Sequence, residues 1–241
     1  MAQGVAWMAR ELGIPATIVA PHNASMSKLA AVERLGGRIV RTSWDEWWAG
    51  MEAGQVDGVD GYFVHPVRDP RVMAGNGTIG LELIEDLDAF DAVLIPWGGG
   101  GLTTGIASAV KALRPETEVY VCEPETGAPV TAAFANGGVP VKVEYTASFI
   151  DGAGSGALLP EMWEHAQSLL TDAFSISLAD AAAGVRLLLE RGRIVGEGAA
   201  GLPVAAAVAG LAGEGRVVCI VSGGNIDPHR LAEILEGRTP D

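Results

Sequence analysis

The sequence predicts an α/β protein built of open, mostly parallel sheets flanked by helices. Short runs rich in β-branched and apolar residues alternate along the chain with longer stretches of helical spacing. Three of the later runs are apolar enough for central strands covered by helices on both faces. Such alternation favours parallel strands joined by right-handed crossovers.

The first third of the chain contains one predicted helix and three predicted strands. The helix covers Met26–Leu35, where the apolar positions have helical spacing and Gly36-Gly37 supplies a C-terminal stop. The predicted strands are Ala16–Ala20, Arg38–Thr42 and Gly61–Val64.

A further helix is predicted to begin after Ser43, because Ser43 and Glu46 have the spacing of a capping box. Trp44, Trp47 and Trp48 lie in its first turns and cannot all face one core. We expect two of them to be buried and one to be exposed, and the alternative is an interface or a ligand wall.

The rest of the chain continues the alternation. The predicted strands are Ala92–Pro96, Glu118–Cys122 and Val217–Val221, and the predicted helices are Leu102–Leu113, Leu159–Leu170, Leu178–Arg191 and Pro203–Ala212. His65-Pro66 and Asp69-Pro70 are expected to interrupt regular structure. We therefore predict a small α/β lobe over residues 1–70 and a large α/β lobe over residues 71–241.

Composition excludes several classes of partner. The 16 basic and 30 acidic residues give a formal net charge of −14, which argues against binding to nucleic acid. No apolar run is long enough for a membrane span, and no signal peptide is evident, so the sequence predicts a cytoplasmic protein. Cys122 and Cys219 lie in strand-like runs and are expected to be buried and reduced.

A run of four glycines, Gly98–Gly101, follows a predicted strand and opens a predicted helix near Leu102. Glycines let backbone N–H groups approach an anion closely, and the start of a helix adds unpaired N–H groups and a positive dipole end. The run therefore predicts a site for phosphate or another small oxyanion. No Gly-Lys-Ser/Thr follows, which excludes a Walker A loop. The same loop would serve equally as an oxyanion hole.

Several motifs occur together in a familiar order. They are Val64-His65-Pro66, Ala74-Gly75-Asn76-Gly77-Thr78, Gly98–Leu102, Cys122-Glu123-Pro124, Gly196-Glu197-Gly198-Ala199 and Ser222-Gly223-Gly224-Asn225. In this order they resemble pyridoxal-phosphate enzymes of the tryptophan synthase β-like fold, specifically the threonine dehydratase and serine racemase group.

The resemblance implies pyridoxal phosphate as cofactor. Its phosphate would be held by Gly98, Gly99, Gly100, Gly101 and Leu102. Ser222, with Gly223, would meet the pyridine nitrogen, and Asn76 and Glu197 would lie beside the ring. A hydroxyl at the pyridine nitrogen suits β-elimination from serine or threonine. The alternative for Ser222 is a turn or N-cap residue before Pro228.

The family's Schiff-base lysine precedes a Ser/Thr-Gly-Asn-His-Ala-Gln-Gly loop, of which this chain contains only Ala2-Gln3-Gly4. The resemblance therefore predicts a truncated N-terminus without that lysine, so the catalytic residue is unknown and any bound cofactor is non-covalent. Lys28, Lys111 and Lys142 are expected to be solvated. Uncovered sheet edges would favour a homodimer.

Some relatives bind a divalent ion near the position of Glu123. No acidic residue occurs near Pro129 here, so we expect a solvated glutamate and no metal.

Three functions stay open. The first is a lyase that removes the β-hydroxyl of hydroxy-amino acids. The second is a non-catalytic remnant that binds phosphate or pyridoxal phosphate. The third is a pocket recruited to hydrolyse an activated ester or phosphoester, for which Ser222, Asp227 and His229 are close in sequence. The other histidines, His22, His65 and His165, are expected to face solvent.

Overall fold

The chain divides into two units, Met1–Pro66 and Val67–Asp241, in a computed structural model that describes all residues from 1 to 241. The predicted division after residue 70 stays a prediction. The expected interruption at Asp69-Pro70 is the start of a helix. The Asp69 carboxylate accepts a hydrogen bond of 2.8 Å from Arg71 N, and Pro70 occupies the first turn, where a missing N–H costs nothing.

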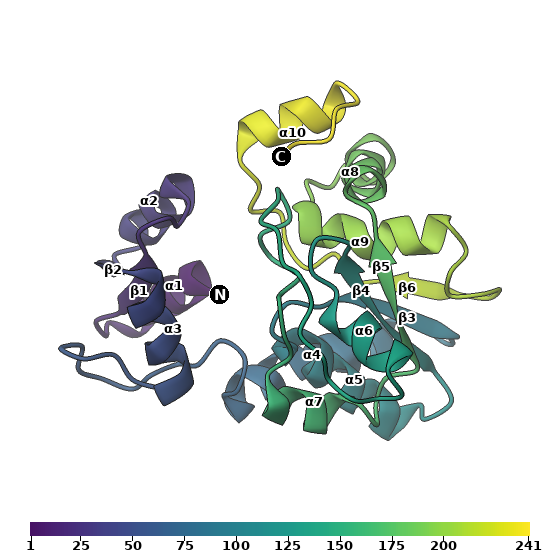
Figure 1. Ribbon diagram of the computed structural model, residues 1–241, viewed down its shortest axis with the longest axis horizontal. Coiled ribbons are helices and arrows are strands. Elements are labelled where there is room, and N and C mark those ends of the chain that lie inside the picture. Colours follow the sequence, from purple (N-terminus) through teal and green to yellow (C-terminus); the bar gives the residue numbers. More distant parts are fainter. The chain divides into compact units, whose positions relative to one another are not determined.

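Unit 1, Met1–Pro66, contains a sheet of two parallel strands, β1 (Thr17–Pro21) and β2 (Arg38–Thr42), which are joined by α2 (Met26–Arg34) (Figure 1). The other helices of the unit are α1 (Ala2–Leu12) and α3 (Trp44–Ala53). The predicted strand over Gly61–Val64 is wrong. Gly61 has φ +129°, outside the range of an L-residue in a strand, and the segment is irregular.

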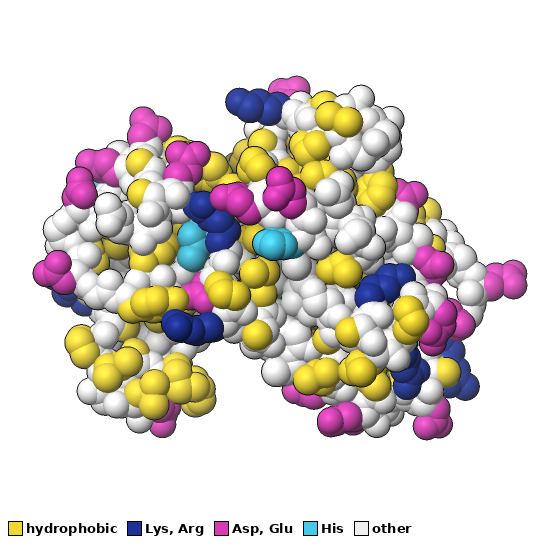
Figure 2. All heavy atoms as spheres, turned by 90° about the horizontal axis from the view of Figure 1, so that it is seen from below, with side chains coloured by type: hydrophobic (Ala, Val, Ile, Leu, Met, Phe, Trp, Pro, Cys, Tyr) yellow, Lys and Arg dark blue, Asp and Glu magenta, His cyan; other side chains and the backbone are white.

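The capping box that begins α3 is confirmed, since Glu46 N donates to Ser43 Oγ and Ser43 N donates to Glu46 Oε2. The expectation of two buried tryptophans is wrong. Trp44 and Trp48 are 53% and 42% exposed and Trp47 is half-buried, with ring centroids 5.1 Å apart for Trp44–Trp47 and 6.3 Å apart for Trp47–Trp48. A two-stranded sheet is too small to cover three indoles. Figure 2 shows apolar side chains gathered at one end of this unit.

Unit 2, Val67–Asp241, is built on four parallel strands in the order β5-β4-β3-β6. Their bounds are Asp172–Ile176 for β5, Glu118–Pro124 for β4, Ala92–Pro96 for β3 and Val217–Cys219 for β6. All five residues of β3 are buried, so the prediction of a central, doubly covered strand is confirmed there.

Helices cover both faces of this sheet (Figure 1). One face packs Val93, Ile95 and Val121 against α5 (Gly101–Leu113), α6 (Pro129–Ala135) and α7 (Pro160–Ala166), with α4 (Pro70–Asp86) beyond α5. The other face packs Leu94 and Cys122 against α8 (Leu178–Leu187), α9 (Gly198–Val208) and α10 (Pro228–Leu235). A single π-helical turn, Leu188–Gly192, extends α8.

Several predicted helices differ in their bounds. The helix predicted over Pro203–Ala212 begins at Gly198, and Pro203 lies inside it, because the surrounding glycines and alanines are completely packed and stabilise the helix through burial. The helix predicted over Leu159–Leu170 ends at Ala166. The fold class itself is confirmed.

Candidate functional site

Three segments that are far apart in sequence meet next to the loop that follows β3. A Cβ atom built on Gly98 would lie 3.0 Å from the carbonyl oxygen of Gly152. A Cβ atom built on Gly152 would in turn lie 3.1 Å from Glu197 Oε1. Because β3 and β6 run parallel, the loops after them emerge at the same edge of the sheet, where ligands bind in open α/β folds.

The loop of four glycines, Gly98–Gly101, is called the cradle here, and side chains on its second and third glycines would collide with neighbouring residues. Gly100 has φ +95° and is the N-cap of α5, and a Cβ there would lie 2.6 Å from the indole of Trp97. A Cβ on Gly99 would lie 2.5 Å from Val67 Cγ2. The first N–H groups of α5 have no partner within the helix, so they are available to an anion.

Two hydrogen bonds hold the start of α5 in place, and the first of them ties it to β3. Thr103 Oγ1 donates to the carbonyl oxygen of Pro96 at 3.2 Å, and Thr104 N closes the first helical turn on Gly100 O at 2.8 Å. Trp97, which the sequence analysis did not single out, is 1% exposed and supports Gly100 from below. The backbone N–H of Trp97 donates to Cys122 O at 3.1 Å, which extends the pairing between β3 and β4 into the loop.

Glu197 lies between two glycines on the opposite wall. Its Oε1 is 3.1 Å and 3.0 Å from the positions that Cβ atoms of Gly152 and Gly223 would occupy. Its backbone N–H donates to Gly223 O at 2.9 Å. A Cβ atom at 152 or 223 would press on this carboxylate. Gly152 was missed in the sequence, although the glycines at 152 and 154 are a signal for close backbone approach.

Ser222 is exposed in the segment between β6 and α10. The N-cap of α10 is Asp227, so the alternative of Ser222 as an N-cap is wrong. Ile220 N donates to Leu94 O at 3.0 Å, so the segment leaves the sheet next to β3 and brings Gly223 to Glu197.

Asn76 lies elsewhere, within α4, where its Cβ is 2.9 Å from the position that a Cβ of Gly105 would occupy. Asn76 therefore packs against Gly105 of α5, one helical turn beyond the cradle. Its placement beside a cofactor ring stays a prediction.

Glu123 corrects the sequence analysis most clearly. The expectation of a solvated glutamate is wrong, because the side chain is fully buried at the end of β4. Its carboxylate accepts hydrogen bonds from Val130 N at 3.0 Å, Thr131 N at 2.9 Å and Thr131 Oγ1 at 3.0 Å. Burial raises the pKa of Glu123 to about 7 despite these hydrogen bonds. Across the chain, no group of three or more His, Cys, Asp or Glu side chains is placed to hold a metal ion.

The remaining candidates are distributed over the molecule. Lys111 donates to Pro115 O at 3.2 Å near the end of α5 that is remote from the cradle. His65 is buried, with Nε2 3.1 Å from Met51 O, so the expectation of a solvent-facing ring is wrong there. Both cysteines are free, Cys122 buried and Cys219 half-buried. None of the helices has the length and apolar character needed to cross a membrane.

Comparison with known proteins finds similarity over almost the whole chain. The sequence profile of a family described as pyridoxal-phosphate dependent enzymes matches residues 1–223. L-threonine ammonia-lyase of Thermotoga maritima is 36% identical over 97% of this chain, and serine racemase of Rattus norvegicus is 31% identical over 99%. The chain spans 59% of the first relative's length and 73% of the second's.

Two solved structures show the same fold. The processed form of threonine deaminase isoform 2 from Solanum lycopersicum superposes with a TM-score of 0.83 at 28% identity, covering 98% of this chain and 70% of that one. Maize serine racemase superposes with a TM-score of 0.82 at 27% identity, covering 98% of this chain and 73% of its own.

Proposed function

Because the chain belongs to the family of pyridoxal-phosphate dependent enzymes, we propose that it serves a lyase that removes the β-hydroxyl group of hydroxy-amino acids. The observation that supports the proposal is the approach of the segments at Gly98, Gly152, Glu197 and Gly223 to one another at one sheet edge. Ser222 precedes Gly223 in the chain. The relatives named as threonine ammonia-lyase and serine racemase support serine or threonine as the substrate class.

The cradle fits the phosphate of the cofactor. Backbone N–H groups between Gly98 and Leu102 would hold it, because a run of glycines lets the backbone approach an anion closely. Such a site needs no cationic side chain, so it is compatible with a net charge of −14. Ser222 would hydrogen-bond the pyridine nitrogen, with Gly223 beside it.

The chemistry that pyridoxal phosphate supplies when bound is an electron sink for cleavage of bonds to the amino-acid Cα. Ser222 would tune that sink, because a hydroxyl at the ring nitrogen does not hold a proton there as a carboxylate would. The restrained sink favours loss of a β-substituent over transamination. Glu197 would lie beside the ring and orient it, held in place by Gly152 and Gly223.

A second candidate is binding of phosphate or pyridoxal phosphate without turnover. It is supported by the location of the cradle, Glu197 and Ser222 within unit 2. Under this second candidate, hydrogen bonds and charge would hold phosphate or pyridoxal phosphate without a covalent bond. The protein would then act as a carrier or a sensor.

The test compares pyridoxal phosphate with pyridoxal, which lacks the phosphate, by equilibrium dialysis and absorption spectroscopy. We expect the phosphorylated form to bind at least about tenfold more tightly, since several charge-assisted hydrogen bonds are involved. Gly99→Asp, whose side chain would collide with Val67 and distort the glycine run, should abolish this preference. Ser155→Ala, at a serine bonded to Ala157 O, is the matched control and should keep it.

Ammonia release from L-serine and L-threonine separates the two candidates. If the chain releases ammonia and Gly99→Asp abolishes that release, the lyase is established. Tight binding of pyridoxal phosphate without ammonia release would establish the binding protein. Equal affinity for pyridoxal and its phosphate would contradict both.

A further inference from the structure

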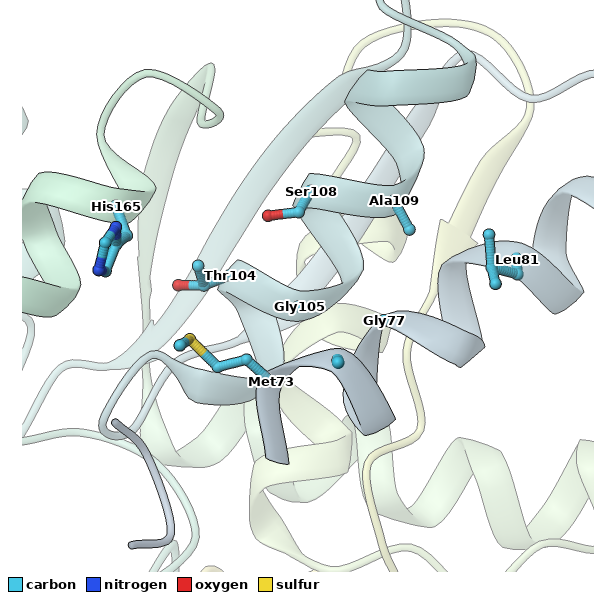
Figure 3. A pocket seen from close by; sticks show the side chains of 9 residues that line it. Met73, Gly77, Leu81, Thr104, Gly105, Ser108, Ala109 and His165 are labelled. Carbon is cyan, nitrogen blue, oxygen red and sulfur yellow. The ribbon is translucent and has the colours of Figure 1, made fainter. Parts of the chain in front are cut away.

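A groove of about 480 Å³ runs along the line where α4 and α5 cross, outside the site described above (Figure 3). Met73, Gly77 and Leu81 line it from α4, Thr104 and Ser108 line it from α5, and His165 closes one side from α7. All of these residues belong to unit 2. The volume is in the range of small-molecule sites.

The groove exists because glycines bring the two helices unusually close. A Cβ on Gly105 would collide with the carbonyl oxygen of Met73, and one on Gly77 would lie 3.2 Å from Gly105 O. At Gly77 and Gly105, which have no side chains, backbone atoms form a flat floor of the groove. A flat apolar body fits such a floor better than a branched one.

Thr104 points a buried hydroxyl with no partner at this groove. The residue is only 5% exposed, and its Oγ1 makes no hydrogen bond. The neighbouring Thr103 is equally buried, yet its hydroxyl is bonded to Pro96 O. A buried unsatisfied hydroxyl is unfavourable and is rare in native proteins, so an external partner is the simplest explanation.

Two further polar groups lie near Thr104. Ser108 follows it by one helical turn on the same face of α5, and His165 lies across from both (Figure 3). In Figure 3 the hydroxyls of Thr104 and Ser108 point in the same direction, towards His165. Hydroxyl and imidazole groups donate and accept hydrogen bonds, so together they suit a head group that does both.

The surroundings disfavour a charged ligand. Glu161 and Glu164 lie on α7 beside His165, and Glu161 is already paired with Arg68 at 3.1 Å. These carboxylates repel an anion, and hydroxyls alone do not hold a cation. The other end of the groove is apolar, with Leu81 and Ala109.

We propose that this groove is an accessory binding site for a small neutral molecule with a flat apolar body and a single alcohol or amide head. The head bonds Thr104, Ser108 and His165, and the body lies on the glycine floor between α4 and α5. The site is separate from the cradle and does not depend on the proposed function.

The test uses benzyl alcohol and toluene, which share a flat body and differ in the hydroxyl head. Binding is followed by NMR of the imidazole C–H groups, of which the four histidines give few, with His165 assigned by His165→Gln. We expect benzyl alcohol to shift the His165 signals and to bind more tightly than toluene. Thr104→Val should weaken benzyl alcohol by about threefold to tenfold and leave toluene unchanged, as expected for one lost hydrogen bond.

Thr103→Val is the matched control for folding. It removes a bonded hydroxyl and should lower the melting temperature, whereas Thr104→Val removes an unpaired hydroxyl and should maintain or raise it. Ser108→Ala, at an exposed position, gives a second binding variant that does not disturb the core.

Three results would overturn the proposal. They are no shift of His165 at millimolar benzyl alcohol, equal effects of Thr104→Val on both probes, and a melting temperature that falls with Thr104→Val as much as with Thr103→Val. Self-association that Leu81→Glu abolishes, with no response to either probe, would assign the groove to a second copy of the chain and would also overturn it.

Discussion

Glu123 shows how burial decides the chemistry of a single carboxyl group. Its pKa is raised from 4.5 to about 7, chiefly by desolvation. A carboxyl whose pKa is higher in the folded chain binds its proton more tightly there, so folding is most favoured when it is protonated. The contribution is fully present below pH 4.5 and is lost as the pH rises through 7.

We therefore expect the free energy of unfolding to fall by about 3 kcal/mol from this group between pH 4.5 and 7, at 1.36 kcal/mol for each pKa unit. Glu123→Gln should remove this slope, because an amide does not titrate. Urea unfolding at several pH values measures it. Glu116→Gln, at an exposed carboxyl, is the control and should keep the slope. A slope that survives in Glu123→Gln would show that another group causes it.

The absence of a side chain at Gly105 permits the close approach of α4 and α5. Gly105→Ala would drive a Cβ into the carbonyl oxygen of Met73, which is backbone and cannot turn away. We expect a loss of about 1–3 kcal/mol of unfolding free energy, typical of overpacking. Gly75→Ala is the matched control on α4, since nothing lies within 4 Å of its Cβ position and alanine favours a helix. Chemical denaturation compares the two, and equal effects would rule out the steric explanation.

At the scale of the element, helix α3 depends on a cap that α2 does not have. Ser43 exchanges hydrogen bonds with Glu46, whereas Ser25, the N-cap of α2, makes no side-chain cap bond. Ser43→Ala should cost unit 1 about 1 kcal/mol, and Ser25→Ala should cost clearly less. Urea unfolding followed by tryptophan emission includes α3, since three of the six tryptophans, Trp44, Trp47 and Trp48, lie in it. Similar losses in both variants would contradict the role of the cap.

Elements with strong local patterns were predictable from the sequence, and those without were not. The strands Arg38–Thr42 and Ala92–Pro96 were predicted with their observed bounds, because each is a run of β-branched or apolar residues between turn signals. Strand β5 was missed because Asp172 and Ser175 interrupt its apolar pattern. Helix α4 was missed because its three glycines, of which Gly77 and Gly80 permit close packing on α5, lower its helix propensity.

The site shows the same limit at the scale of the whole molecule. The place of the glycine run between a strand and a helix was predictable from the apolar pattern on either side, while its use as an anion site stays a prediction. The meeting of Glu197 with Gly152 and Gly223 was not predictable, because it depends on three segments that pack together only in the fold. The burial of Glu123 was equally hidden, since its partners Val130 and Thr131 come from the next helix.

The two units of the molecule should differ in stability. Unit 2 has strands covered on both faces, while β1 and β2 form a two-stranded sheet whose residues are mostly half-buried. We expect amides of β3 and β4 to exchange with deuterium more slowly than those of β1 and β2, by about tenfold or more. Hydrogen exchange measured by mass spectrometry tests this, and equal protection would show that the units unfold together.

The pairing of β3 with β6 has a consequence for biosynthesis. The Asp91 carboxylate accepts a hydrogen bond of 2.7 Å from Arg216 N, 125 residues later in the chain. On the ribosome, β3, the glycine cradle and α5 are therefore complete long before β6 and Gly223 have been made. The edge of β3 stays unpaired during that interval, and it is open to mispairing with another nascent chain. A ligand that touches both the cradle and Gly223 stabilises only the finished product, so cofactor supply would act on the last step of maturation.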